Sequence, residues 1–376
     1  MKVLIATGIF PPDAGGPAAY VPAFARALAG DHEVIGVVTL SDRLDHDDSS
    51  LPFPVVRIAR NGNRLVRRIR TVGIIWRLLA KADVVYLNGL VLEGICAARI
   101  FRRKPTVIKV VSDKIWEQAS AHRATDLGVV DFQRPGGKSM KWMFLRWLQS
   151  TYTRAATRVI TPSRYLAALV AGWGIKDERV HVIPNAVQHD PDSAKDDMVP
   201  DHDVVTVARL LPLKRIGRLI EVCGRRGWSL LVVGDGPERE ALEALAQSSP
   251  ARVTFAGQVE RAAVTSQMRR GRVFALNSTI EGLPHVVLEA RLAGRPVVAT
   301  AVGGTPETIN DGVDGYLVPS GHDARLEQAL ARLLDDEDHC AFIAAAGRAD
   351  ALRRFTWEAM YRDTVDVLRV ASDVRG

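Results

Sequence analysis

Short apolar segments alternate with longer amphipathic segments along nearly the whole chain. The apolar segments are residues 3–6, 34–39, 84–87, 106–111 and 158–161 in the first half, and 204–207, 229–233, 253–255, 273–276 and 296–299 in the second half. Apolar runs of this length that alternate with helices are typical of buried parallel strands. The sequence therefore predicts an α/β protein built from doubly wound parallel sheets.

The chain is long enough for two such domains. At 376 residues it exceeds the size that one hydrophobic core normally serves. Between the two series of apolar segments, residues 188–203 are polar, acidic and interrupted by proline, which is typical of a surface linker. We therefore predict one doubly wound domain over residues 1–184 and a second that begins at residue 185.

The composition is that of an ordinary globular protein, with 47% hydrophobic and 25% charged residues. Cys96, Cys223 and Cys340 are far apart and form no C-x-x-C pair, so we expect neither a disulfide framework nor a zinc site. Pro11 and Pro12 interrupt the N-terminal apolar run without a signal-peptide cleavage site. No apolar stretch approaches the roughly 18 residues that span a bilayer. We expect a cytoplasmic protein that does not cross a membrane.

Pairs of glycines stand where two predicted helices begin. Gly15 and Gly16 follow the first apolar run, and Gly303 and Gly304 follow the run 296–299. Glycines at this place let a ligand approach the free backbone N–H groups of a helix start, which favour phosphate. On these residues alone, a tight turn without a ligand is an equally good interpretation.

Two cations follow an apolar run in the second half. Arg209 and Lys214 flank the turn after residues 204–207, where cations could neutralise a diphosphate leaving group. A solvated loop is the alternative interpretation. Gly234 ends a neighbouring run, but the third glycine of a dinucleotide-binding fingerprint is missing because Arg239 stands there.

Two glutamates are separated by seven residues. Glu281 precedes a turn of Gly282, Leu283 and Pro284, and Glu289 lies one or two helical turns beyond it. Hydroxyl-rich ligands need such acceptors, and a carboxylate also stabilises positive charge that develops at a sugar carbon. The pattern indicates sugar chemistry.

These motifs, in this order, resemble those of the retaining glycosyltransferases of family four, which have the GT-B fold of two Rossmann-like domains facing a central cleft. The resemblance covers nearly the whole chain and rests on Arg209…Lys214, Gly234-Asp235-Gly236-Pro237, Glu281-Gly282-Leu283-Pro284…Glu289-Ala290, Gly303-Gly304-x-x-Glu307, Phe10-Pro11-Pro12, Gly15-Gly16 and Val182-Ile183-Pro184-Asn185. It implies that residues 1–184 form the acceptor-side domain, that residues 185–355 bind the donor, and that a C-terminal helix over residues 356–376 returns to the first domain.

The resemblance also implies roles for individual residues. Arg209 and Lys214 are expected to bind the donor diphosphate, Glu281 the donor sugar near the reacting carbon, and Glu289 the ribose. The remaining expected donor contacts come from Gly15, Gly16, Gly234, Gly282, Leu283, Pro284, Gly303 and Gly304. Residues 112–117 are similar to a Gly-Asp-x-x-Trp-Glu variant where many members have a histidine, which makes Asp113 a further catalytic candidate.

The implied reaction is the retaining transfer of a sugar from a nucleotide-diphosphate sugar, with UDP- or GDP-sugars favoured, to a hydroxyl acceptor. No metal or other cofactor is expected. The acceptor we favour is a surface-polysaccharide or lipid-linked glycan. Two alternatives stay open: a transferase with a soluble small-molecule acceptor, and a nucleotide-sugar epimerase or hydrolase on the same fold.

The net charge of +7 is concentrated in the first half of the chain. Residues 64–81 carry Leu65, Ile69, Val72, Trp76 and Leu79 on one helical stripe among many arginines. One interpretation is peripheral binding to an anionic membrane surface on its inner face. The other is an ordinary helix with a core-facing stripe and a solvated basic face. No recognition motif accompanies the charge, so we expect no nucleic-acid partner.

Overall fold

The computed structural model describes residues 1–13, 15–122, 124–125, 127–134, 139–187 and 199–373. They divide into two compact units: unit 1 is Met1–Ile183 with Tyr361–Gly376, and unit 2 is Pro184–Met360. The division thus falls one residue before the boundary predicted at residue 184, and the chain returns to unit 1 at Tyr361. Residues 188–198 of the predicted linker lie outside the described residues.

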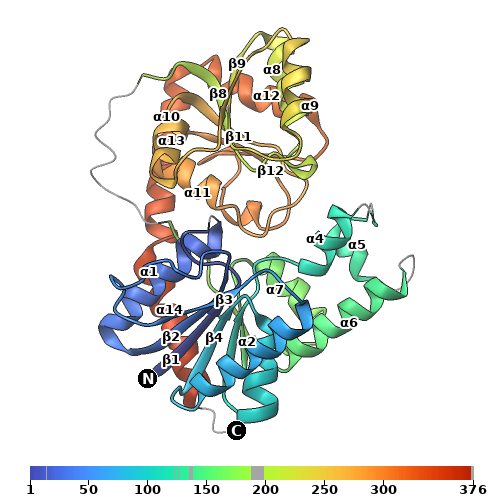
Figure 1. The fold of residues 1–376 in the computed structure, drawn as a ribbon. Coiled ribbons are helices and arrows are strands. Elements are labelled where there is room, and N and C mark those ends of the chain that lie inside the picture. Colours follow the sequence, from blue (N-terminus) through green and yellow to red (C-terminus); the bar gives the residue numbers. More distant parts are fainter. Residues whose placement is uncertain (14, 123, 126, 135–138, 188–198, 374–376) are drawn as a thin grey trace. The chain divides into compact units, whose positions relative to one another are not determined.

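Unit 1 is built on a sheet of seven strands in the order β3-β2-β1-β4-β5-β6-β7, and all its pairings are parallel (Figure 1). The strands are β1 (Lys2–Thr7), β2 (Glu33–Ser41), β3 (Val55–Ala59), β4 (Val84–Asn88), β5 (Thr106–Lys109), β6 (Arg158–Thr161) and β7 (Val180–Val182). Its helices are α1 (Gly16–Asp31), α2 (Arg64–Leu79), α3 (Val91–Ile95), the π-helical η1 (Cys96–Arg102), α4 (Lys114–Ala121), α5 (Val129–Gln133), α6 (Met140–Arg154), α7 (Arg164–Ala171) and the 3-10 turn η2 (Asp177–Arg179). The last helix, α14 (Trp357–Asp373), packs on α1, where the hydroxyl of Tyr361 donates to Asp31 at 3.1 Å.

Unit 2 holds a six-stranded sheet, again parallel throughout, in the order β10-β9-β8-β11-β12-β13. The strands are β8 (His202–Val207), β9 (Ser229–Val233), β10 (Arg252–Gly257), β11 (Gly271–Leu276), β12 (Val297–Thr300) and β13 (Tyr316–Val318). The helices are α8 (Ile216–Arg226), α9 (Arg239–Gln247), α10 (Val264–Arg269), α11 (His285–Leu292), α12 (Asp323–Leu334) and α13 (Glu337–Arg354), with the 3-10 turns η4 (Pro212–Lys214), η5 (Arg261–Ala263) and η6 (Thr305–Glu307).

The predicted fold class is confirmed: both units are doubly wound α/β layers. The predicted strands are all present, but three short strands, β3, β7 and β13, were missed. Each lies at an edge of its sheet, and in each the side chains are mostly half-exposed. An edge strand needs no continuous apolar run because one of its sides faces no neighbouring strand, so periodicity gives it little signal.

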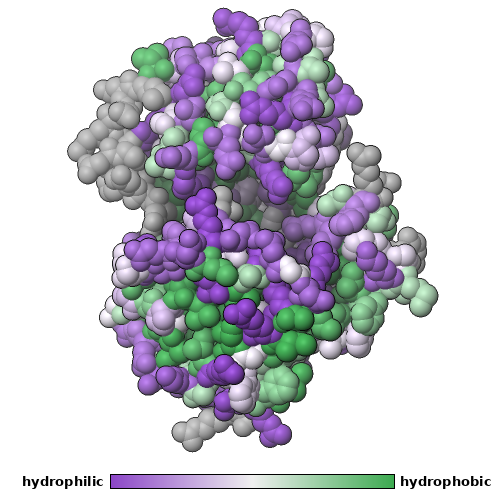
Figure 2. Space-filling view, viewed as in Figure 1, coloured by the Kyte–Doolittle hydropathy of each residue, from purple (hydrophilic) through white to green (hydrophobic). Residues whose placement is uncertain are grey.

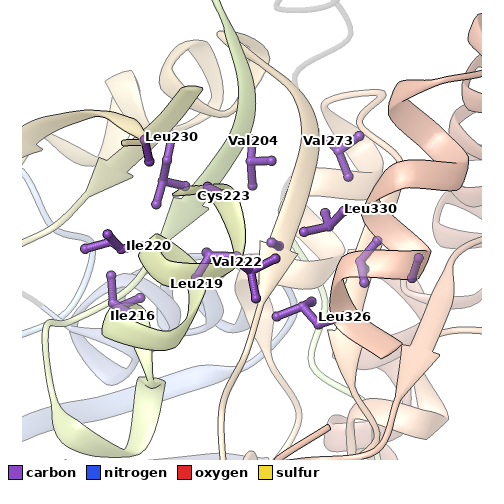
Figure 3. Close-up of a cluster of buried hydrophobic side chains, with 14 of the residues drawn as sticks. Val204, Ile216, Leu219, Ile220, Val222, Cys223, Leu230, Val273, Leu326 and Leu330 are labelled. Atoms are coloured by element: carbon purple, nitrogen blue, oxygen red, sulfur yellow. The ribbon is translucent and has the colours of Figure 1, made fainter. Parts of the chain in front are cut away.

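The core of unit 2 explains why α8 lies where it does. Ile216, Leu219, Ile220 and Cys223 recur at helical spacing and are buried against the sheet. Figure 3 shows these side chains facing Val204, Leu230 and Val273 of the strands and Leu326 and Leu330 of α12. Burying each such aliphatic side chain contributes about 1.5–3 kcal/mol. The helix start, which follows Lys214 and Arg215, is therefore fixed at the carboxyl edge of the sheet.

The basic helix α2 differs from the expectation of a core-facing stripe. Its fully buried side chains are Thr71, Ile75 and Leu79, whereas Leu65 and Ile69 are 67% and 64% exposed. The core-facing interpretation is therefore wrong for the first half of the stripe. Of the predicted stripe only Leu79 is fully buried, and the other two buried residues, Thr71 and Ile75, each lie one position before the predicted Val72 and Trp76.

Candidate functional site

The strand order of unit 2 reverses between β8 and β11. Successive connections run outward from β8 on one side and from β11 on the other, which leaves a crevice beyond the carboxyl ends of these two strands. Lys214 stands in η4 after β8, and Glu281 follows β11. The Lys214 ammonium forms an ion pair with Glu281 Oε1, and Ser278 Oγ donates to the same oxygen at 2.6 Å. Both charged side chains are largely but not fully buried, so Lys214 does not extend into solvent as a loop lysine would.

Hydrogen bonds fix the two loops to each other. The N–H of Thr279 donates to the carbonyl of Leu213 at 2.8 Å, and the Asn277 amide donates to the carbonyl of Arg215 at 3.4 Å. The backbone on either side of Lys214 is thus held by residues that precede Glu281. These two hydrogen bonds hold the loops that carry Lys214 and Glu281 together.

The Gly303-Gly304 pair is required by close packing over Glu281. Gly303 has φ +55°, and a Cβ there would overlap the carbonyl oxygen of Glu281. The N–H of Gly304 donates to that same oxygen at 3.0 Å. The segment after β12 therefore lies directly on the backbone of Glu281, and no residue with a side chain fits at position 303.

A similar contact holds the loop that carries Arg209. Gly234 has φ +130°, and a Cβ at this position would overlap the carbonyl oxygen of Ala208. The N–H of Leu210 donates to the carbonyl of Asp235 at 2.9 Å. Arg209 itself is exposed, and within the described part of the chain its guanidinium has no hydrogen-bond or ion-pair partner. This arginine is free to bind an anionic group.

Helix α11 carries the second glutamate of the pair. Leu283 and Pro284 are buried just before it, and Glu289 is 5% exposed. One carboxylate oxygen of Glu289 pairs with Arg261, while Oε2 is buried and has no hydrogen-bond partner among the described residues. A buried acceptor left without a partner costs about 1–3 kcal/mol, so a ligand hydroxyl at this oxygen would recover stability.

The site can therefore supply the unpaired Arg209, the Lys214–Glu281 ion pair and the carboxylate of Glu289. Helix α8 begins without a side-chain cap, so among the described residues its first N–H groups are open to a ligand. Among the described residues, no three His, Cys, Asp or Glu side chains gather as a metal ion would need. This chemistry suits an anionic, hydroxyl-rich molecule.

In unit 1 the strand order reverses between β1 and β4. Gly15 and Gly16 begin α1 after β1, with no side-chain cap on the helix. Sequence reasoning missed the partner loop after β4, where Gly89 has φ +126° and a Cβ would overlap the backbone nitrogen of Gly8. Leu90 beside it has φ 49°, a left-handed conformation that is rare for a branched side chain. The signal was present as Asn88-Gly89 after an apolar run.

Asp113 occupies a structural position. It is 3% exposed and caps α4, where its Oδ1 accepts from the N–H groups of Ile115 and Trp116 at 3.0 and 3.1 Å. The amides of Gln133 and Gln149 donate to Oδ2 and Oδ1 at 2.8 and 3.1 Å. Both carboxylate oxygens are thus engaged within unit 1, Oδ1 by three donors and Oδ2 by one.

A buried lysine was not singled out from the sequence. Lys109 is 6% exposed at the end of β5, with its ammonium 4.0 Å from the centre of the Tyr20 ring. Burial lowers the pKa of Lys109 to about 7, and burial raises the pKa of Tyr20 to about 12. The Tyr20 hydroxyl lies 3.1 Å from that of Tyr86. A lone lysine inside the apolar run 106–111 was the available signal.

Two family profiles match most of the chain. Residues 15–186 match the profile described as a glycosyl transferase 4-like domain, and residues 193–350 match the profile of glycosyl transferases group 1. The chain belongs to the GT-B glycosyltransferases of family four. Among the described residues of this glycosyltransferase, no helix has the length and apolar character needed to cross a bilayer.

Similar proteins match from over half to nearly all of the glycosyltransferase. A GDP-mannose-dependent alpha-(1-6)-phosphatidylinositol monomannoside mannosyltransferase of Mycobacterium tuberculosis is 27% identical over 400 residues, covering 98% of each chain. The lipopolysaccharide core biosynthesis glycosyltransferase LpsD of Rhizobium meliloti is 32% identical over 227 residues, or 57% of this chain and 65% of that protein.

Solved structures agree with the fold. Anabaena Alr3699/HepE, crystallised with UDP and glucose, superposes with a TM-score of 0.77 at 21% identity, covering 98% of this chain and 100% of that one. Sucrose-phosphate synthase from Thermosynechococcus elongatus superposes with a TM-score of 0.79 at 22% identity and 98% coverage of both chains. At such identity, these similarities establish the fold alone.

Proposed function

We propose that this glycosyltransferase moves a sugar from a UDP- or GDP-sugar to a hydroxyl of a lipid-linked or surface-polysaccharide glycan, with retention of configuration and without a metal ion. The observation that carries the proposal is the Lys214–Glu281 pair at the β8/β11 switch point, packed under Gly303 and Gly304. Cations there can stabilise the negative charge of a departing diphosphate, and a carboxylate can stabilise the positive charge that develops at the sugar carbon. The mycobacterial relative, whose name specifies GDP-mannose and a phosphatidylinositol mannoside, supports a glycolipid acceptor.

In the proposed reaction, the bond between C1 of the sugar and the β-phosphate oxygen breaks, and the nucleoside diphosphate leaves with the electron pair. Arg209 and Lys214 neutralise the leaving group. The acceptor oxygen bonds to C1 on the same face, and its proton passes to the departing phosphate oxygen. Glu281 either stabilises the cationic sugar or traps it covalently, and Glu289 binds the ribose.

An exposed face of unit 1 supports a membrane-bound acceptor. This docking face is formed by α2 and the adjoining η1, where Leu65, Val66, Ile69, Ile100 and Phe101 are each 58–67% exposed. Figure 2 shows hydrophobic surface gathered over α2 with hydrophilic patches within it. The basic side chains of the same two elements are Arg64, Arg67, Arg68, Arg70, Arg77, Arg99 and Arg102. Apolar side chains among arginines fit an anionic lipid surface, and we propose peripheral binding to the inner face of a membrane.

The test is a thermal-shift and turnover panel with UDP-, GDP-, ADP- and dTDP-sugars and EDTA present. We expect one nucleotide to raise the melting temperature, and Arg209→Ala to abolish the rise while the exposed Arg218→Ala preserves it. Retention of the anomeric configuration in the product, followed by NMR, tests the stereochemistry. Full activity in Glu281→Ala would contradict both proposed roles of that residue. Turnover without any acceptor would instead indicate an epimerase or hydrolase.

A further inference from the structure

A buried ion network lies behind the Gly303-Gly304 segment in unit 2. Arg291 of α11 is fully buried, and its Nη2 pairs with Asp314 at 3.1 Å and with Asp350 of α13 at 3.0 Å. Its Nη1 donates to the carbonyl of Thr308. Burial alone would raise the pKa of Asp350, but Arg354, Arg291 and Arg353 together outweigh that effect and lower it. The three arginines therefore favour the ionised form of Asp350.

A second arginine extends this network to the same segment. Arg354, the last residue of α13, pairs through Nη1 with Asp350 at 3.0 Å. Its Nη2 donates to the carbonyl of Glu307 at 2.6 Å. Two guanidinium groups joined by one aspartate thus hold two successive carbonyls, those of Glu307 and Thr308, at the end of η6.

The other end of that segment touches Glu281. The N–H of Gly304 donates to the Glu281 carbonyl, and Gly303 packs on it without room for a side chain. Residues 303–308 are therefore held at one end by the arginine network and at the other by the backbone of Glu281. Any loosening of the network changes where this segment, and Glu281 under it, can lie.

We propose that Arg354, supported by Asp350 and Arg291, is a positioning residue that fixes residues 303–308 in the conformation that binds the donor. The effect on donor binding rests on the proposed function, whereas the contacts that hold residues 303–308 do not depend on it. Misplacing a binding segment by about 1 Å can reduce the rate 100-fold without any contact being lost to the substrate. Arg354 acts through the segment and does not itself touch the donor.

The chain offers a matched control in the neighbouring residue. Arg353 also pairs with Asp350, at 2.7 Å, and it is 74% exposed against 34% for Arg354. Within the described part of the chain the guanidinium of Arg353 pairs with Asp350 and not with η6, whereas Arg354 binds the Glu307 carbonyl. Comparing Arg354→Met with Arg353→Met therefore separates the positioning of η6 from the general loss of a charge beside Asp350.

The experiment measures amide hydrogen exchange, donor affinity and kcat in the full-length protein and both variants. We expect Arg354→Met to speed exchange of the amides in residues 303–308 at least ~10-fold and to raise the KM for the donor about 10-fold, which equals ~1.4 kcal/mol. Arg353→Met should stay within about 2-fold of the wild type in both. Arg354→Lys keeps one group that can donate a hydrogen bond to the Glu307 carbonyl. Its KM for the sugar donor should therefore lie between those of the wild type and Arg354→Met.

Each contrary result has a distinct meaning. Equal exchange of residues 303–308 in the two variants would overturn the positioning role, whatever the activity of the enzyme. Faster exchange in Arg354→Met with an unchanged donor KM would show that the segment does not serve the donor, which also overturns the inference. A wild type that binds no nucleotide would contradict the proposed function, and the exchange comparison would still decide whether Arg354 holds the segment.

Discussion

Lys214 and Glu281 form an ion pair between the two loops that flank the strand reversal in unit 2. The two residues are 67 positions apart in the chain, and they meet because β8 and β11 are neighbours in the sheet. Their charges offset each other in the absence of a ligand, so neither is left unpaired in the crevice. In the proposed reaction the donor diphosphate would pair with Lys214, and the carboxylate of Glu281 would then be available to the sugar.

Glu289→Gln should weaken nucleotide binding about 10-fold, because one buried oxygen of this carboxylate has no hydrogen-bond partner among the described residues and is proposed to accept from the ribose. The nucleoside diphosphate found in the sugar panel and its 2′,3′-dideoxy analogue are compared by calorimetry. The variant should lose affinity for the first and not for the second. Glu243→Gln, on the exposed side of α9, serves as the control. An equal loss for both nucleotides would contradict contact with the ribose.

Asp113→Ala should destabilise unit 1 by about 2–3 kcal/mol, because it removes a helix cap, leaves the buried amide of Gln149 without an acceptor and removes one of the two acceptors of the Gln133 amide. The control, Asp336→Ala, removes a cap from α13 that has no buried amide partner and should cost about 1 kcal/mol. Urea unfolding measures both. A normally stable Asp113→Ala protein with kcat reduced 100-fold would instead support the catalytic role suggested by the sequence.

Lys109→Met should stabilise the protein at pH 7 and lose that advantage at high pH. The pKa of Lys109 is about 7 in the fold, against 10.5 for a free lysine. Between these values the unfolded chain binds a proton that the folded chain does not, so the wild type gains stability as pH rises. We expect the variant to exceed the wild type by at least about 1 kcal/mol at pH 7 and by little at pH 10.5.

The control for this pH dependence is Lys114→Met, because Lys114 is exposed on α4. Urea unfolding at pH 7, 8.5 and 10.5 compares the two variants with the wild type. Parallel pH profiles for the wild type and Lys109→Met would show that Lys109 keeps its proton in the fold, with the Tyr20 ring compensating for the lost water.

Ile69→Asp and Phe101→Asp should each reduce binding to vesicles that contain phosphatidylglycerol at least 10-fold, since an inserted aliphatic or aromatic side chain contributes about 1.5–3 kcal/mol. Sedimentation with vesicles at low and high salt measures the binding. The control is Phe342→Asp, because Phe342 is 63% exposed but belongs to unit 2. If all three variants bind as the wild type does, or if the wild type ignores anionic vesicles at low salt, the docking face has another purpose.

Three elements show which parts of the fold could be predicted from the sequence. Strand β9 has the predicted bounds because all five of its side chains are buried, so its apolar run is continuous. Strand β13 was missed because only one of its three side chains is buried. For α2 the spacing predicted the helix correctly but not its orientation. An apolar stripe indicates a periodic face without indicating whether anything covers it.

The candidate site was likewise predicted only in part from the sequence. The positions of Lys214, Glu281 and Gly303 were predicted by motif spacing, but their contacts were not. Asp113 illustrates the opposite outcome: a motif suggested chemistry, whereas the fold surrounds its carboxylate with a helix start and two glutamine amides. Arg291, Asp350 and Arg354 gave no signal, because the contacts that join α11 to α13 and both arginines to the carbonyls of Glu307 and Thr308 span 17 to 59 residues of the chain.

The sequence by itself determined what depends on neighbours along the chain: the alternation of strands and helices, the two doubly wound sheets, and the order of motifs typical of a family-four glycosyltransferase. The tertiary structure decided what depends on neighbours in space. It determined which oxygen of Glu289 has no partner among the described residues, that Lys109 is buried, and that Arg291 and Arg354 hold the segment over Glu281. The reason is physical. Periodicity and turn chemistry act over a few residues, whereas burial, ion pairing and close packing arise only when distant segments meet.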